Sequence, residues 1–378
     1  MVSGYEGVVR GRHQQIYTSG GLPSMASFTK GTNRGNKSGQ QFQGPRTTVA
    51  IVGFMEENII VPDHDITRHP IWLDHQYFRF ITDRSPDFQN ALKINRTILS
   101  NMVLDDLREY IRHKNVYYYP PKETVLTLDE SYNLIRLILT QQMTAYQLSE
   151  FLHNRYLMLN NKSGKHNCIL IKGVPSVGKT WFANLLGKLM INTGYIGNSN
   201  RYNQFPFQDC PRRNLLIFDE PNVEPSSYEN FKLLFAGTPL SANIKYESRN
   251  LVNRTPVIIC CNSDPFPHNP EFNSRIYRYT WNTRIDSILT NIKGHPHPDG
   301  LYRLLLQYNT LSTLPPTGML QNNVPVEEYR EADTYMQAIL EEDATSLLTT
   351  FIPDTPNDME IEFERLQRSH NNMDAWDI

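Results

Sequence analysis

The stretch NCILIKGVPSVGKTWFANLLGKLM, residues 167–190, constrains the fold of this 378-residue chain more than any other part of it. An apolar run is followed by a glycine-rich loop and then by a segment with the apolar spacing of a helix. This is the G-x-x-x-x-G-K-[ST] pattern in the strand–loop–helix setting that the pattern requires. The loop consists of Gly173, Val174, Pro175, Ser176, Val177, Gly178, Lys179 and Thr180.

The residue types of this loop suit a nucleoside triphosphate. Its glycines let backbone N–H groups close around phosphate oxygens, and the start of the following helix adds a partial positive charge. Lys179 is expected to reach the β- and γ-phosphates, and the Thr180 hydroxyl is expected to ligate Mg²⁺. The alternative, a chance match in a glycine-rich turn, is disfavoured by the correct flanking segments.

Two later apolar runs end in polar residues. LLIFDE (215–220) ends in Asp219 and Glu220, and PVIICCN (256–262) ends in Asn262. Apolar strands alternate with helical segments in this part of the chain, which predicts a largely parallel sheet. The polar residues are therefore expected at the edge of the sheet where α/β proteins bind their ligands.

Each of these polar residues has a predicted role. Asp219 is expected to hold Mg²⁺, directly or through water, and Glu220 is expected to orient and deprotonate the attacking water. Asn262 is expected beside the γ-phosphate, where it positions that water. The alternatives are a strand that ends in solvated acids and an asparagine that only forms a turn.

Two further stretches are ambiguous from their residues alone. LSANIKYESRN (240–250) is polar and turn-prone, and by itself it is typical of a solvated hairpin that carries Lys245. RIYRYTW (275–281) alternates basic and aromatic residues like a strand. Either one of its arginines reaches the γ-phosphate of a neighbouring subunit, or the stretch is an exposed edge strand.

Composition narrows the class of protein. A hydrophobic fraction of 39% is enough for a core, and no apolar run reaches the roughly 18 residues needed to cross a bilayer. The beginning of the chain has no apolar signal segment, so we expect neither secretion nor a membrane partner. The cysteines lack C-x-x-C spacing, so neither a disulfide framework nor a zinc knuckle is indicated and a reducing compartment is expected. They are Cys168, Cys210, Cys260 and Cys261. Cys260 and Cys261 are interpreted as small strand residues rather than nucleophiles, because no basic partner is evident nearby.

Charge is distributed unevenly along the chain. Residues 321–378 carry 14 acidic and 3 basic residues, which leaves 34 basic and 25 acidic residues in 1–320. A basic body with an acidic tail favours a polyanionic partner for the body, and ordinary solubility charge is the alternative.

The chain divides into five predicted regions. A strand is expected at the start of 47–62, a helix at 88–114, one or two amphipathic helices in 126–159, and a helix near 301–312. The regions are a disordered basic arm (1–47), an uncertain α/β region (48–120), a helical segment (121–163), an ATPase domain (164–313) and an acidic, disordered tail (314–378).

Six blocks of the chain resemble the superfamily 3 helicase domain, within the AAA+ ATPases, of parvovirus and densovirus non-structural replication proteins. The resemblance covers roughly residues 165–285, and its motifs occur in the family's order. NQFPFQDC favours parvoviruses over papillomaviruses and polyomaviruses. The blocks are GVPSVGKT (173–180), NQFPFQDC (203–210), LLIFDE (215–220), AGTPLSANIKYES (236–248), TPVIICCN (255–262) and SRIYRYTW (274–281).

The resemblance implies an AAA+ P-loop NTPase core, a mostly parallel sheet flanked by helices, with an N-terminal helical bundle for oligomerisation. It implies ATP-driven unwinding of single-stranded and forked DNA by a homo-oligomeric ring, usually a hexamer, with 3′→5′ polarity, in viral DNA replication in the host nucleus. The family's arginine at the end of the last core strand acts on the neighbouring subunit's ATP and matches Arg275. The lysine of the family's DNA-gripping hairpin matches Lys245.

The sequence also departs from the family. A second basic residue often follows the hairpin lysine by two positions, but here Glu247 stands there, with Lys232 and Arg249 as possible compensation. Larger relatives carry a nicking nuclease with a His-hydrophobic-His pair. That pair does not precede the helicase blocks, so no nicking activity is predicted. The nearest patterns are Tyr110 with Lys114, interpreted as a surface helix, and His295 with His297, interpreted as structural.

Two other functions remain open. In the first, the chain is a transcriptional regulator that uses ATP only for oligomerisation. Its acidic tail resembles an activation segment for host transcription or replication factors. The presence of Glu220 and Asn262 argues against an ATP site that has lost its hydrolytic activity. In the second, the chain is an RNA-directed superfamily 3 ATPase.

Overall fold

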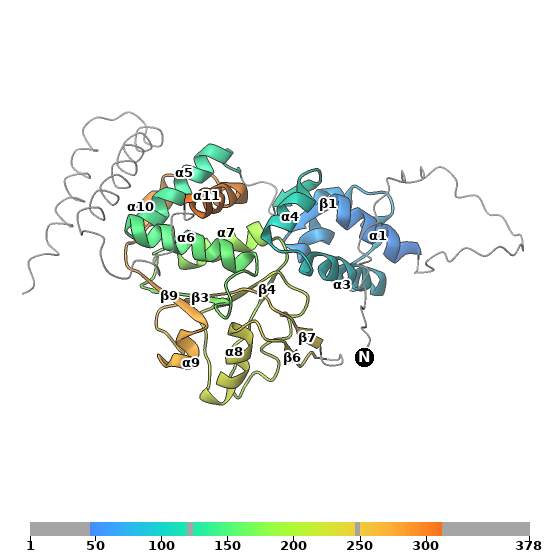
Figure 1. The fold of residues 1–378 in the computed structure, drawn as a ribbon. Coiled ribbons are helices and arrows are strands. Elements are labelled where there is room, and N and C mark those ends of the chain that lie inside the picture. The colour runs from blue at the N-terminus through green and yellow to red at the C-terminus, as the bar shows by residue number, and fades with distance from the viewer. Residues whose placement is uncertain (1–45, 119–123, 246–249, 312–378) are drawn as a thin grey trace, which may run out of the picture. The chain divides into compact units, whose positions relative to one another are not determined.

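The computed structural model describes residues 46–118, 124–245 and 250–311 (Figure 1). The predicted tail 314–378 lies outside the described residues, as does all of the predicted arm except its last two positions. A five-stranded parallel sheet with the strand order β4-β5-β8-β3-β9 organises the described part. Its strands are β3 (Cys168–Gly173), β4 (Thr193–Tyr195), β5 (Leu215–Asp219), β8 (Val257–Cys261) and β9 (Ile276–Trp281).

The central strands are apolar on both sides, as expected for a parallel sheet with both faces covered. β8 is buried throughout, and it lies between β3 and β5, with Ile258 opposite both Ile169 and Ile217. Because all five strands point the same way, the ends of β3, β5 and β8 meet at one edge. The predicted AAA+ P-loop NTPase core, a mostly parallel sheet flanked by helices, is confirmed.

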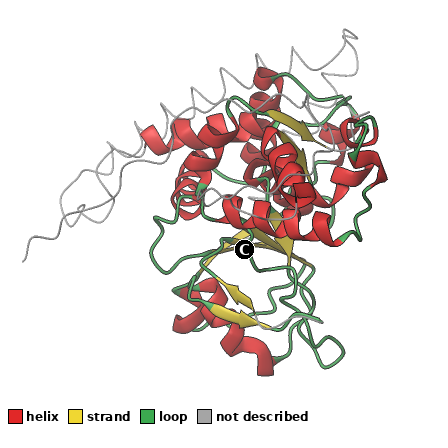
Figure 2. Cartoon of the chain, turned by 90° about the vertical axis from the view of Figure 1, so that its right-hand side faces the viewer, coloured by secondary structure: helices red, strands yellow, loops and turns green. Residues whose placement is uncertain are grey.

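Four helices cover one face of the sheet (Figures 1 and 2). Two of them form the predicted helical segment, and each begins with a capping box, Thr127 with Glu130 and Thr144 with Gln147. Both pack on the last of the four helices, and all four share one apolar core with the sheet. The helices are α5 (Leu128–Thr140), α6 (Ala145–Leu159), α7 (Lys179–Met190) and α11 (Pro298–Leu311).

The opposite face of the sheet carries shorter elements. Phe231, Phe235 and Phe272 pack there in a second apolar core with residues of β5 and β8. An antiparallel hairpin also lies on this side, with Leu240 opposite Val252. The elements are η3 (Pro225–Ser227), α8 (Tyr228–Phe235), β6 (Leu240–Ala242), β7 (Asn250–Val252) and α9 (Pro270–Asn273), and α10 (Asp286–Thr290) follows β9.

The region before the ATPase core is mostly helical, and two of its predicted elements are wrong. The first is the strand expected from residue 47. These residues are helical, because Ile51 and Met55 lie one helical turn apart and are buried with residues of the helix α3 (Pro86–Ser100). The second is the single helix 88–114, because the first helix ends at Ser100 and a second helix begins at Leu104. The elements are α1 (Arg46–Glu57), β1 (Asn58–Val61), η1 (Asp63–Arg68), α2 (Pro70–Leu73), η2 (Phe78–Phe80), α3 (Pro86–Ser100), α4 (Leu104–Ile111) and β2 (Asn115–Tyr118).

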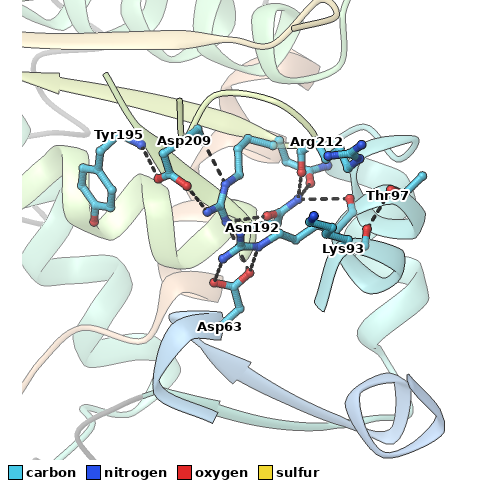
Figure 3. A network of polar contacts seen from close by, with 10 residues as sticks. Asp63, Lys93, Thr97, Asn192, Tyr195, Asp209 and Arg212 are labelled. Carbon is cyan, nitrogen blue, oxygen red and sulfur yellow. Dashed lines mark hydrogen bonds and ion pairs between the residues drawn. The ribbon is translucent and has the colours of Figure 1, made fainter. Parts of the chain in front are cut away.

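A buried polar network joins this region to the edge of the sheet beside β4 (Figure 3). Asp63 accepts two hydrogen bonds from Arg96, at 2.6 Å and 2.8 Å, and one from Arg213 at 3.3 Å. Nδ2 of Asn214 donates to the carbonyls of Leu99 and Met102, at 2.7 Å and 2.8 Å. The N-terminal helices are therefore held to the sheet by oriented, buried hydrogen bonds as well as by apolar packing.

Among the residues that the structure describes, no helix is long and apolar enough to cross a membrane.

Candidate active site

The loop between β3 and α7 has an unusual backbone. Ser176 has φ +68° and Gly178 has φ +89°, so both adopt the left-handed conformation. Gly173, at the start of the loop, packs directly against β9, because a Cβ atom there would lie 2.1 Å from the carbonyl oxygen of Trp281. These constraints explain why glycine is needed at positions 173 and 178.

Gly173 allows a direct test of this packing. Gly173→Ala is expected to destabilise the protein by about 1–3 kcal/mol, because the new methyl group meets backbone that cannot move aside. Gly53→Ala is the control, since nothing lies within 4 Å of a Cβ at that exposed helical position. The control is expected to gain about 0.5–1 kcal/mol. Urea unfolding of both variants measures the difference, and equal stabilities would contradict the proposed clash.

Lys179 lies folded over the loop, with only 6% of its surface exposed. Its Nζ donates to the carbonyls of Gly173 at 2.6 Å and Val174 at 3.0 Å, and to Oδ1 of Asn262 at 3.0 Å. The structure thus brings two predicted site residues, Lys179 and Asn262, into direct contact. A phosphate oxygen that displaces one of these acceptors would meet a positively charged donor already in place.

Thr180 and Asp219 also meet. The Thr180 hydroxyl lies 3.2 Å and 3.3 Å from the two carboxylate oxygens of Asp219. A hydroxyl and a carboxylate beside a phosphate loop are the oxygen ligands that Mg²⁺ takes together with phosphates and water. Among the described residues no cluster of three or more His, Cys, Asp or Glu could hold a metal by itself. The donor set therefore fits a magnesium ion that arrives with a triphosphate.

Glu220 directly follows β5 and has φ +44°, a left-handed conformation that costs a non-glycine residue about 1–3 kcal/mol. Its backbone N–H donates to the carbonyl of Cys260 at 2.8 Å, which holds the turn against β8. Asp219 and Glu220 are both exposed. The chain therefore turns sharply after Asp219. The carboxylates of Asp219 and Glu220 both lie at the edge of the sheet where β5 ends.

The cysteines of β8 are core residues, as predicted. Cys260 and Cys261 are both buried. Burial raises the pKa of the Cys261 thiol to about 12, so this thiol is protonated at neutral pH and is a poor nucleophile.

Arg275 does not end the last core strand, so the predicted position is wrong. Its backbone N–H closes the turn after α9 by donating to Phe272, and β9 begins at the next residue. Its Nε donates to the carbonyl of Lys232 at 3.1 Å. Because the strands are parallel, Arg275 lies at the edge opposite the phosphate loop. The predicted action on a neighbouring subunit's ATP remains a prediction.

Arg278 lies inside β9 and is fully engaged within its own chain. Its guanidinium donates to Asp264 and Asn273, both at 2.7 Å, and to the carbonyl of Pro267 at 3.2 Å. The Asp264 carboxylate is nearly buried, with 7% of the side chain exposed. These contacts make Arg278 a structural residue that fixes the loop after β8.

Lys245 follows β6 and is exposed at the turn side of the predicted hairpin. Glu247 and Arg249 lie outside the described residues. Lys232 forms ion pairs with Glu229 at 2.6 Å and Glu271 at 2.7 Å, so its charge is neutralised locally. The expected compensation for Glu247 by Lys232 is therefore not supported.

Residues 46–118 do not contain the five-stranded sheet of a nicking nuclease. In this range the described structure has two paired strands, β1 and β2, and they are parallel. The Tyr110–Lys114 pair and the residue His297 of the His295–His297 pair make local contacts. Lys114 lies over the ring of Tyr110 at 4.3 Å, and the His297 N–H donates to Ser131 at 2.8 Å where α11 begins.

Two contributors to the site were missed by sequence reasoning. Gln142, in the turn after α5, and Thr283, after β9, bond to each other, and Gln142 also bonds to the carbonyl of Val177 in the phosphate loop. No motif marks either residue, because the contacts depend on which loops the fold brings together.

The sheet order, the phosphate loop and the paired Thr180 and Asp219 define a P-loop NTPase of the AAA+ type. The sequence model of the parvovirus non-structural protein NS1 matches residues 61–293, which is more than half of the chain. The chain belongs to the parvovirus non-structural protein NS1 family, as the resemblance predicted.

Individual relatives agree with this assignment. The chain is 35% identical over 185 residues to initiator protein NS1 of Junonia coenia densovirus, covering 48% of this chain and 34% of the relative. It is 34% identical over 196 residues to initiator protein NS1 of Bombyx mori densovirus, covering 45% and 22%. The match therefore spans about a third or less of the length of these relatives.

Solved structures with a similar arrangement include JCV helicase, at 12% identity and a TM-score of 0.36, covering 71% of this chain and 81% of that one. The NrS-1 C-terminal region matches at 13% identity and a TM-score of 0.34, covering 50% and 45%. The fold class rests on the sheet order and the phosphate loop.

Proposed function

We propose that this chain is an ATP-dependent DNA helicase of viral DNA replication that works in the host nucleus. One observation carries the proposal: two polar side chains of the phosphate loop meet two polar side chains from the ends of β5 and β8. Membership of the NS1 family supports it. The four side chains are Lys179, Thr180, Asp219 and Asn262.

The geometry suggests how ATP is hydrolysed. Lys179 exchanges its carbonyl acceptors for β- and γ-phosphate oxygens, and Asn262 keeps its ammonium in place. Mg²⁺ would be held by Thr180 and Asp219 and would neutralise phosphate charge. Glu220, presented beside Asp219, accepts a proton from the attacking water and aligns it with the γ-phosphorus.

Hydrolysis is proposed to drive movement along DNA. Arg275 contacts the ATP of the neighbouring subunit in a ring, proposed to be a hexamer, and stabilises the transferred charge. Lys245, exposed on its hairpin, contacts the phosphates of a single strand that passes through the ring with 3′→5′ polarity.

Purified protein tests the function directly. We expect ATP hydrolysis to rise on addition of single-stranded DNA and labelled forked DNA to be separated when ATP and Mg²⁺ are present. Failure of DNA to stimulate hydrolysis would contradict the helicase proposal. Stronger stimulation by single-stranded RNA than by DNA would instead favour an RNA-directed ATPase.

Lys245→Ala is expected to uncouple hydrolysis from strand separation. Loss of one phosphate contact per subunit should reduce the rate of forked-DNA separation by about tenfold or more and flatten its salt dependence. The measurement is the separation rate at several salt concentrations, with hydrolysis in the absence of DNA recorded alongside. Lys165→Ala, at another exposed lysine, is the matched control. Equal separation rates for both variants would remove Lys245 from the DNA path.

A further inference from the structure

In the turn between α5 and α6, the side chain of Gln142 forms a hydrogen bond with the phosphate loop. Its Nε2 donates to the carbonyl of Thr283 at 2.7 Å and to the carbonyl of Val177 at 3.4 Å. Its Oε1 accepts from the backbone N–H of Thr283 at 3.2 Å. Both ends of the amide are therefore used, and Gln142 links three segments that are distant in the sequence.

One of these segments, residues 282–285 between β9 and α10, is called the strap here. Its last residue, Ile285, donates its N–H to the carbonyl of Ser176 at 3.0 Å. A Cβ atom at Gly178 would lie 2.5 Å from Cδ1 of Ile285, so the isoleucine side chain presses on the loop. Ile285 is itself buried with Leu134 and other residues of α5. The strap is thus fixed between the helix α5 and the phosphate loop.

These contacts fix the direction of two peptide groups. The carbonyl of Ser176 is held by the strap, and the carbonyl of Val177 by Gln142. In a planar trans peptide the N–H points opposite to the carbonyl of the same unit. The N–H groups of Val177 and Gly178 therefore point away from the strap and from the turn. N–H groups oriented together in this way form the concave site that binds phosphate.

The same contacts explain how the loop keeps its backbone conformation. Ser176 is a non-glycine residue with φ +68°, which costs about 1–3 kcal/mol. Such a conformation persists only where the surroundings fix it. In the structure, hydrogen bonds to the carbonyls of Ser176 and Val177 fix the backbone of the loop. A loop fixed before the ligand arrives loses less conformational entropy when the ligand binds.

We propose that Gln142 is a positioning residue of the nucleotide site, which orients the Val177–Gly178 peptide and ties the phosphate loop to the α5–α6 turn. The proposal rests on the proposed binding of ATP. Gln142 acts through Val177 and Thr283 and contacts no phosphate. Displacement of the α5–α6 turn would accordingly loosen the loop and weaken nucleotide binding.

Three variants of the full chain test the proposal. Gln142→Ala removes all three hydrogen bonds, and Gln142→Glu keeps the acceptor for Thr283 but turns a second oxygen toward two carbonyls. Gln141→Ala, at the exposed neighbouring residue, is the matched control. The measurements are the Kd for ATP by calorimetry, KM and kcat for hydrolysis, and the unfolding temperature without nucleotide.

Both Gln142 variants are expected to bind ATP about tenfold more weakly, because they lose the hydrogen bond to the loop and one or two of those that hold the strap against it. KM should rise by a similar factor, while kcat at saturating ATP stays within about twofold of the control. Glutamate should not rescue the affinity, although its size is almost unchanged. The unfolding temperature without nucleotide should stay within a few degrees of the control.

The possible outcomes separate this proposal from the proposed function. If the wild type and Gln141→Ala bind ATP and both Gln142 variants bind it equally well, only the role of Gln142 is overturned. If no variant and no wild-type protein binds ATP, both proposals fall. If the Gln142 variants unfold early but their folded fraction binds ATP normally, Gln142 is merely structural and the positioning role is overturned.

Discussion

Replacing Lys179 with alanine is expected to lower kcat/KM for ATP hydrolysis by about 10²–10³-fold, the usual effect of removing one donor that stabilises transition-state charge. The physical reason lies in its position. Lys179 is nearly buried, and hydrogen bonds to Gly173, Val174 and Asn262 already hold its ammonium group over the loop. Removal leaves the phosphate charge without its nearest point charge, and water cannot replace a preorganised cation.

The assay is the release of inorganic phosphate, with and without single-stranded DNA. Lys162→Ala, at an exposed lysine in the segment before β3, is the matched control and should hydrolyse ATP like the wild type. Lys179→Arg is a useful second variant, because it keeps the charge but replaces a compact ammonium by a planar fork. Hydrolysis by Lys179→Ala within a factor of ten of the control would show that this loop is not the catalytic site.

Asp63→Asn is expected to have the largest effect on stability, about 3–5 kcal/mol. Asp63 is the shared acceptor of two guanidinium groups, and the Arg213 side chain is only 4% exposed. The amide removes the negative charge and leaves Arg96 and Arg213 facing each other with one carboxylate fewer. Breaking one partner of a buried ion pair costs far more than breaking a surface pair. Asp83→Asn, at an exposed aspartate, should stay within about 0.5 kcal/mol of the wild type.

The same residue makes stability depend on pH in a defined direction. Burial by itself would raise the pKa of Asp63, but the hydrogen bonds of Arg96 and the charges of Arg96 and Arg213 outweigh burial and hold this pKa below its ordinary value. The folded state therefore favours ionised Asp63. That stabilisation is complete above the unfolded-state pKa of about 3.9 and is lost as the pH falls through the lower folded-state pKa.

The wild type and Asp63→Asn should consequently become more similar in stability as the pH is lowered below the unfolded-state pKa of about 3.9. Urea unfolding at closely spaced pH values measures this convergence. A stability difference that stayed constant over that range would mean that ionised Asp63 does not stabilise the fold.

The sequence predicted the centre of the site because its parts are local motifs on parallel strands. Lys179 begins the helix after β3, Asp219 ends β5 and Asn262 directly follows β8, and one rule about strand ends brings them together. Where elements depended on tertiary packing, prediction failed. Residues 46–57 contain several β-branched side chains, but their burial with residues of α3 makes them helical.

Tertiary packing also explains why Arg275 was misplaced and Gln142 was missed. Arg275 was placed in a strand because basic and aromatic residues alternate after it. In the structure its backbone N–H instead donates to the carbonyl of Phe272 at the end of α9. Gln142 bonds to residues 35 and 141 positions away along the chain, and no spacing in the sequence signals such contacts.

The position of Arg275 has a consequence for assembly symmetry. In a parallel sheet the carboxyl ends of the strands lie on one side and their amino ends on the other. Here the phosphate loop lies on the carboxyl-end side and Arg275 on the amino-end side. A twofold dimer can pair the loop of one subunit with the arginine of the other only if the strands of its two subunits run in opposite directions, so that both pairs lie in one self-complementary interface. A heterologous, head-to-tail contact pairs loop and arginine once per interface, and repetition of that contact closes into a cycle or grows into a helix. The direction of the strands therefore ties the proposed site to one of these two kinds of assembly, and the proposed ring corresponds to the second.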